Sequence, residues 1–150
     1  MTASTSSATH SNADLAATLL RVTSGVWFLL HAGLKIFVFT PAGTAGFFES
    51  IGLPGFLAYV VILAELIGGL ALIVGFKTRE VALGLSVILL GSIYTPHFAA
   101  GFFFSNPNGG WEFPAMWTVL LLVQAGLGAG AFALGRIAVR GIAMLRMVVA

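Results

Sequence analysis

The chain contains no cysteine and few charged residues. Of its 150 residues, only 8% are Asp, Glu, Lys or Arg. The missing cysteine excludes disulfide bonds, thiol relays and thiolate-held iron–sulfur clusters within this chain. Any redox chemistry must therefore use a bound cofactor or the thiols of a partner protein. The net charge is +2, and the basic residues lie beside predicted membrane spans, which indicates an anionic lipid surface and no nucleic-acid partner.

What the chain has in excess is apolar surface, since 59% of its residues are hydrophobic. A soluble core of this size could not bury so much apolar surface, and the solvent that fits is the lipid bilayer. Four segments have about the 20 residues that a helix needs to cross the hydrocarbon. The predicted fold is therefore all-α, a four-helix transmembrane bundle. Its spans are Leu15–Phe39, Pro54–Phe76, Val81–Gly101 and Phe113–Leu134.

Two tails, a polar one before it and a basic one after it, flank this membrane domain, which we place at residues 15–135. Residues 1–14 are rich in Ser, Thr and Ala, and we expect them to be disordered. They lack the basic region of a secretory signal, so we interpret the first apolar run as a retained helix. Residues 136–150 form a basic tail on the cytoplasmic side. This tail is either an amphipathic helix on the membrane surface or a continuation of the fourth helix.

The distribution of Lys and Arg predicts the orientation. Lys77 and Arg79 lie between the second and third spans, and Arg136, Arg140 and Arg146 follow the fourth. The loops 40–53 and 102–111 contain no Lys or Arg. By the positive-inside rule, both termini and the short turn at residues 77–80 face the cytoplasm.

Glu65 is the most informative residue, because it lies within the long apolar stretch Leu53–Phe76. A charged side chain at the bilayer centre costs at least about 2.5–3.5 kcal/mol, so such groups are usually paired or functional. The other spans and their ends supply five further ionisable candidates. These are Arg21, His31, Lys35, His97 and Glu112.

The depths of these residues predict a polar cluster in the outer half of the bundle, drawn from all four helices. His31 and Lys35 are four residues apart and share a helix face, and Arg21 lies within about 40° of Lys35 on the helical wheel. Two carboxylates, an ammonium and two imidazoles could exchange protons with a quinone or a polar substrate. The alternative is structural: an ion pair of Glu65 with Lys35 or with Arg21 would fix the helix arrangement. We favour the ligand or proton site, because ionisable groups inside membranes are functional by default.

Other chemistries find little support. His31 and His97 could in principle hold a haem, but nothing else in the sequence supports one, and we expect no metal site. The chain contains no phosphate-binding loop, dinucleotide fingerprint, metalloprotease motif or nucleophile elbow. Whether the protein catalyses a reaction is left open, with a non-enzymatic scaffold or small-solute permeation module as the alternative.

A family resemblance rests on short motifs that occur in order between Leu19 and Leu134. The motifs are Leu20-Arg21, Gly25, Gly33, Lys35, Ala64-Glu65, Gly68-Gly69, Gly75, Thr78-Arg79, Ala82, His97, Gly101-Phe102 and Gly109-Gly110-Trp111-Glu112. With this set the chain resembles the DoxX family of membrane proteins.

The resemblance implies a four-helix protein of the bacterial inner membrane. The family is named after a subunit of an archaeal thiosulfate:quinone oxidoreductase, and other relatives are linked to oxidative-stress defence and to thiol-handling enzymes. It therefore implies a redox-associated subunit, with a quinone as candidate ligand and a redox enzyme or a second copy of the chain as candidate partner. The family's recurring polar positions correspond here to Arg21, Lys35, Glu65 and Glu112, and His97 matches less closely.

Overall fold

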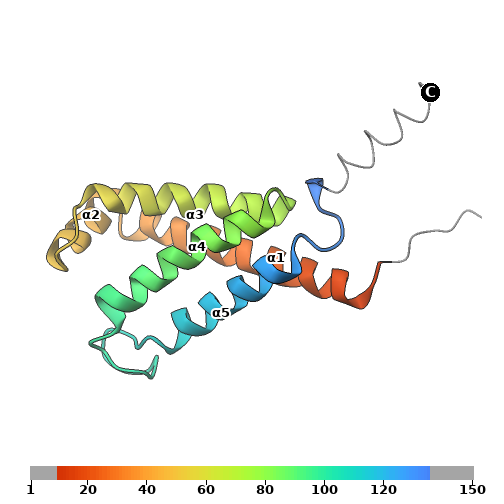
Figure 1. The fold of residues 1–150 in the computed structure, drawn as a ribbon. Helices are drawn as coiled ribbons and strands as arrows, with labels where there is room; N and C mark the ends of the chain where they lie inside the picture. The colour runs from red at the N-terminus through yellow and green to blue at the C-terminus, as the bar shows by residue number, and fades with distance from the viewer. Residues whose placement is uncertain (1–9, 136–150) are drawn as a thin grey trace, which may run out of the picture.

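The computed structural model describes residues 10–135, and all regular structure in this range is helical. Five α-helices follow one another along the chain (Figure 1). They are α1 (Asn12–Gly33), α2 (Pro41–Ser50), α3 (Phe56–Val74), α4 (Thr78–Ser92) and α5 (Glu112–Leu127). Two π-helical turns, Leu34–Val38 and Ile93–His97, extend α1 and α4. Most of the predicted N-terminal tail lies outside the described residues, as does the basic tail with Arg136, Arg140 and Arg146.

Local sequence signals account for several of the helix ends. The Ser11 side chain accepts a hydrogen bond from the backbone N–H of Asp14 at 3.1 Å, so α1 begins at Asn12, earlier than the predicted Leu15. Helix α3 ends where Gly75 adopts a left-handed conformation with φ of 74°. The turn that follows is short, and it places α3 and α4 antiparallel.

The helices are arranged as two pairs, α1 with α3 and α4 with α5, and the contacts between the pairs are less extensive. Gly25 and Gly69 bring the backbones of α1 and α3 close together. A Cβ atom at Gly25 would lie 2.6 Å from the carbonyl oxygen of Gly69. In Figure 1 the two pairs diverge toward the end that holds α2. We call this the α2 end, and the opposite end, with Lys77 and Arg79, the basic end.

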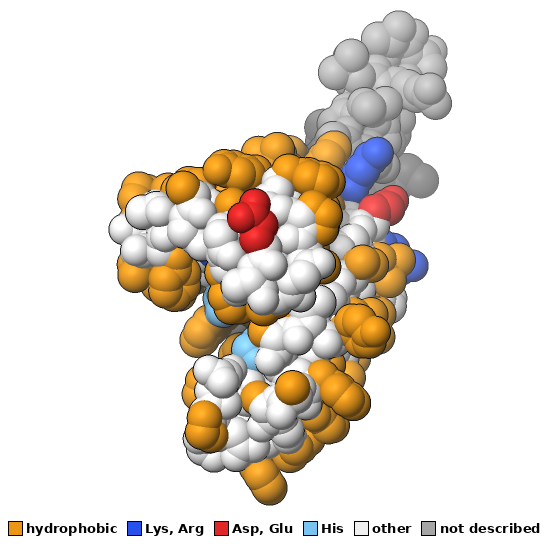
Figure 2. Space-filling model, turned by 90° about the vertical axis from the view of Figure 1, so that its left-hand side faces the viewer, with side chains coloured by type: hydrophobic (Ala, Val, Ile, Leu, Met, Phe, Trp, Pro, Cys, Tyr) orange, Lys and Arg blue, Asp and Glu red, His pale blue; other side chains and the backbone are white. Residues whose placement is uncertain are grey.

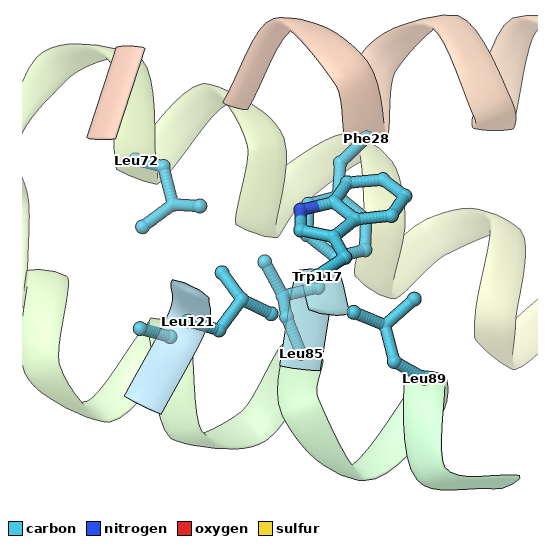
Figure 3. Packing of buried hydrophobic residues seen from close by; sticks show 7 residues of the cluster. Phe28, Leu72, Leu85, Leu89, Trp117 and Leu121 are labelled. Atoms are coloured by element: carbon cyan, nitrogen blue, oxygen red, sulfur yellow. The ribbon is translucent and has the colours of Figure 1, made fainter. Parts of the chain in front are cut away.

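A compact apolar cluster joins the two pairs (Figure 3). Phe28 from α1 lies against Trp117 from α5, with ring centroids 4.3 Å apart. Leu72 of α3 and Leu121 of α5 are fully buried nearer the basic end. Because this cluster draws on all four long helices, it fixes how the two pairs cross.

The outer surface is strongly apolar. Leu19 is 71% exposed, Ile67 59% and Val87 66%, as expected for side chains that face lipid. Three helical segments are long and apolar enough to cross a membrane: Asn12–Val38, Phe56–Val74 and Thr78–His97. The multi-pass membrane class predicted from composition is thus supported by the structure.

The fourth predicted span, Phe113–Leu134, is shorter in the structure. Helix α5 stops at Leu127, because Gly128 turns the chain with φ of 80° and its carbonyl accepts a hydrogen bond from the Gln124 side chain at 2.6 Å. The residues beyond fold back onto α1, where the N–H of Ala131 donates to the carbonyl of Asp14 at 3.1 Å. A cluster of glycines at 126, 128 and 130 allows this turn.

Helix α2 was not predicted, since residues 40–53 were interpreted as a loop. Its start nevertheless carries a standard signal. Thr40 accepts a hydrogen bond from the N–H of Gly43 at 3.1 Å, and Pro41 occupies the first turn. With α2, the described chain has five α-helices in place of the four expected.

Candidate functional site

Lys35 and Glu65 form an ion pair near the α2 end. Lys35 lies in the π-helical turn that follows α1, and Glu65 lies on α3. The Lys35 ammonium donates to both carboxylate oxygens of Glu65 at 2.9 Å. Of the two ion pairs that the sequence left open for Glu65, the structure forms this one. Turns with π geometry occur often at functional sites, and here the turn carries the basic partner.

The two partners differ in exposure. The side chain of Glu65 is 6% exposed and that of Lys35 18%. Among the described residues, Lys35 provides all the hydrogen bonds that reach the Glu65 carboxylate. An ammonium has three N–H donors, and two of them point at Glu65. Among the described residues, the third donor of Lys35 makes no hydrogen bond, and the pair is more exposed on the side of Lys35.

A pocket of about 450 Å³ lies on that side, between the end of α1 and α2. This volume is within the usual range for small-molecule sites, roughly 300–1,000 Å³. The residues that line it are His31, Leu34, Lys35, Phe39, Gly43, Thr44, Phe47 and Phe48. Glu65 is not among them, and its contact with the pocket lining is the pair with Lys35. Half of the lining comes from α2, which lies in a segment that the sequence predicts as a loop.

His31 connects the pocket to the apolar cluster. Its imidazole lies one helical turn before Lys35, and its ring centroid is 5.3 Å from that of Trp117. The ring is therefore held by an aromatic neighbour from the other helix pair. Figure 2 looks onto the α2 end and shows histidine side chains in the hollow between the two pairs. His31 and Lys35 both line the pocket and are its two nitrogen-bearing ionisable side chains.

Arg21 is placed elsewhere, in the basic half of the protein. Its guanidinium donates to the carbonyls of Leu72 and Ile73, both at 2.6 Å, and more weakly to that of Ala131 at 3.4 Å. The side chain is only 1% exposed. Along α1, about 21 Å of helix separates Arg21 from Lys35. Arg21 therefore caps the C-terminus of α3 and does not reach the pocket, although both residues share a helix face.

His97 and Glu112 stabilise the connection between α4 and α5. Nδ1 of His97 lies 2.7 Å from the carbonyl oxygen of Gly109, so this nitrogen carries the proton and donates. The Glu112 carboxylate accepts from the backbone N–H of Phe104 at 3.2 Å. Within the described range, neither side chain hydrogen-bonds to a residue that lines the pocket. The predicted polar cluster is therefore divided into three places.

The described residues contain no group of three or more His, Cys, Asp or Glu side chains that could hold a metal ion. His31 and His97 also have separate environments, an aromatic ring and a backbone carbonyl. The pocket has instead the character of an organic ligand site, with aromatic walls, one ammonium and one imidazole.

Comparison with known proteins identifies a family for this chain. The DoxX family model matches residues 16–98, which is more than half of the chain. The chain belongs to the DoxX family. The matched range includes Arg21, Lys35, Glu65 and His97, and it ends before Glu112. No solved structure matches the chain.

Three relatives are similar in sequence. "Putative oxidoreductase CatD" of Bacillus subtilis is 43% identical over 89 residues, which are 59% of this chain and 65% of CatD. "Inner membrane protein YqjF" of Escherichia coli is 34% identical over 90 residues, 59% of this chain and 68% of YqjF. An uncharacterized protein of Haemophilus influenzae is 35% identical over 117 residues, 77% of this chain and 84% of the relative. The chain thus spans slightly less than two thirds of CatD.

Proposed function

We propose that this DoxX protein is a redox-associated membrane subunit that holds a quinone or a small polar substrate in the pocket beside Lys35. The observation that carries the proposal is the bidentate Lys35–Glu65 pair next to a cavity of about 450 Å³. A buried ion pair is costly unless it is well paired or used. The oxidoreductase name of CatD supports the same direction.

The chemistry of the site follows from the three ionisable groups. The free N–H of Lys35 would donate to a carbonyl or hydroxyl oxygen of the ligand. Glu65 holds Lys35 in place and keeps the local charge balanced, so a neutral head group suits the pocket. His31 lies close enough along the helix to exchange a proton with a bound ligand. Because the chain has no cysteine, a partner enzyme would supply the electrons.

We further propose that the chain crosses the bacterial inner membrane four times with both termini in the cytoplasm. Lys77 and Arg79 mark the basic end as the cytoplasmic side, and the sequence adds three arginines after α5. Helix α5 has 16 residues, about 24 Å, so residues 128–134 would complete the fourth crossing. Irregular backbone at this depth is tolerated where protein covers it, and Ala131 and Ala133 are fully buried. The name of YqjF supports the inner membrane.

The substitution Glu65→Gln tests this function. Glutamine keeps the size of the side chain and can still accept a hydrogen bond from Lys35, so the fold should persist. The ammonium then lacks a counter-charge, and we expect quinone binding to fall at least about tenfold. Binding can be followed by extracting bound lipophiles from the purified protein and by titrating quinone in detergent. Unchanged binding with both measurements would remove the pocket from the mechanism.

The second candidate is a non-enzymatic scaffold or small-solute permeation module, in which the buried charges only organise helices. The role of Arg21 favours this alternative, because every hydrogen bond it makes is to a backbone carbonyl. Under this hypothesis, no redox molecule co-purifies, and Glu65→Ala lowers thermal stability without any change in ligand binding. Permeation by so small a bundle would require a homo-oligomer.

A further inference from the structure

The polar and apolar parts of the pocket lining are separated in depth. Thr44 is 4% exposed and the Lys35 side chain 18%, so the polar groups lie toward the interior. Leu34, Phe39 and Phe47 also line the pocket, but they are 43%, 59% and 49% exposed. We call these three residues the apolar rim. A ligand that enters must pass the apolar rim before it meets Lys35.

The surface around the apolar rim is almost uncharged. Residues 36–64 carry Glu49 as their one charged residue, and residues 81–111 carry none. Exposed aromatic side chains are frequent at this end. Phe37 is 83% exposed, Tyr94 83% and Phe103 60%. Figure 2 shows the corresponding face, in which orange and white surface dominates. Aromatic residues without neighbouring charges are typical of the membrane–water interface.

From this segregation we infer that the pocket opens into the lipid, at the level of the headgroups, and that its ligand is an amphiphile. The polar head enters first and reaches Lys35 and His31, while an apolar tail stays between Leu34, Phe39 and Phe47. This inference rests on the proposed function and narrows it, because it selects a tailed, lipid-soluble ligand over a small polar solute. Leu30 and Phe37, on the same helical segment as Leu34, are also exposed and apolar, which favours lipid over water around the apolar rim.

The depth of the apolar rim can be measured with nitroxide labels, because the chain has no native cysteine. Gly46→Cys places a label on α2 beside Phe47, at a position with open space. Leu63→Cys on the exposed face of α3 and Lys77→Cys at the basic end serve as lipid and water references. In vesicles of phosphatidylethanolamine and phosphatidylglycerol, the Gly46 label should collide with oxygen more than with a water-soluble nickel complex. A nickel accessibility equal to that of the Lys77 label would overturn the inference.

The ligand class can be tested with one benzoquinone head that carries either a decyl tail or no tail. Quenching of tryptophan fluorescence reports binding, since Trp117 lies against His31. Concentrations are expressed per lipid, because a tail alone enriches the compound in the membrane. We expect the tailed compound to bind roughly tenfold more tightly on this scale. The variant Phe47→Asn should remove most of this preference, whereas Phe103→Asn, which lies outside the pocket, should keep it.

The outcomes separate this inference from the proposed function. Equal binding of both compounds would overturn the tailed ligand and leave the redox pocket standing. Absence of binding for both compounds would overturn the proposed function itself. A preference for the tail that Phe47→Asn leaves unchanged would show that the tail lies elsewhere, and it would also overturn the inference.

Discussion

Two basic residues of the same helical segment, Arg21 buried and Lys35 partly exposed, have opposite surroundings. Arg21, near the basic end, is 1% exposed and donates to backbone carbonyls at the C-terminus of α3. Among the residues that the structure describes, no carboxylate pairs with it. Lys35, near the α2 end, donates to the Glu65 carboxylate and faces a cavity. Both tie α1 to α3, but only Lys35 retains a donor that a ligand could use.

The difference shows how a buried cation in a membrane protein can be classified. Carbonyl oxygens at a helix C-terminus carry partial negative charge, and a planar guanidinium can satisfy two of them at once. Such a site is closed to a ligand, because the acceptors that hold the guanidinium belong to the main chain. A carboxylate partner can change its protonation state, and an ammonium can turn toward another acceptor. The contacts of Arg21 are those of a structural residue, whereas those of Lys35 are compatible with the ligand role that we propose for it.

The largest effect that this comparison predicts is that of Arg21→Ala. The change removes two short charge-assisted hydrogen bonds and leaves the carbonyls of Leu72 and Ile73 without their partner. We expect a loss of about 3–6 kcal/mol in the free energy of unfolding. Thermal unfolding in a mild detergent, followed by circular dichroism, would measure it.

Arg21→Lys is the matched control for that variant. It keeps the charge but replaces the planar fork by a single ammonium, so it should recover only part of the lost stability. Ligand binding measured per folded protein should be unchanged in Arg21→Lys. Weaker binding per folded protein would place Arg21 in the functional site, and the contrast between Arg21 and Lys35 would no longer hold.

A smaller effect is expected when the Lys35–Glu65 pair is broken. Lys35→Met leaves a buried carboxylate without its partner and should cost about 3 kcal/mol, the lower part of the usual range, because Lys35 is partly exposed. The double variant Lys35→Met with Glu65→Leu removes both charges and should recover most of that stability. It should not recover ligand binding.

Thermal unfolding of both single variants and of the double variant gives the coupling free energy, and a quinone titration gives the binding. If the double variant regained binding together with stability, the pair would be as structural as Arg21. The ligand would then bind without these charges, and the role proposed for Lys35 would be wrong.

Much of the fold was predictable, because a helix that crosses the lipid needs about 20 mostly apolar residues. The apolar runs that became α1, α3 and α4 are long, and the charges at 77–80 interrupt them clearly. Helix α2 was not predicted, because it has only ten residues and four of them are Gly or Ala. Thr40-Pro41 is nevertheless a helix-start signal. The end of α5 was placed too late, because an apolar glycine-rich segment that folds back onto α1 has the same hydropathy as a helix.

The candidate site was predictable only in part. The sequence offered Lys35 and Arg21 as ion-pair partners of Glu65, and the structure pairs Glu65 with Lys35, while His31 and Lys35 line the same pocket. The sequence places Arg21 with them, because the angle on a helical wheel ignores distance along the helix axis. The acceptors that Arg21 uses are the backbone carbonyls of Leu72 and Ile73, which no pattern of side chains reveals. The aromatic walls from α2 could not be foreseen without α2 itself.

The smallest effects concern the close contact of α1 and α3, which positions both cations. A Cβ atom at Gly25 would lie 2.6 Å from the Gly69 carbonyl oxygen and 2.8 Å from Ile73 Cγ1, so the helices must move apart. We expect Gly25→Ala to lower the free energy of unfolding by about 1–3 kcal/mol.

Gly84→Ala is the matched control, because nothing lies within 4 Å of its Cβ position. It should raise the free energy of unfolding by no more than about 1 kcal/mol. Since Gly25 lies between Arg21 and Lys35 on α1, Gly25→Ala should weaken ligand binding as well as stability, whereas Gly84→Ala should leave binding unchanged. Equal binding in the two variants would mean that the Lys35–Glu65 site keeps its geometry without the close helix contact, and the two ends of α1 would then be independent.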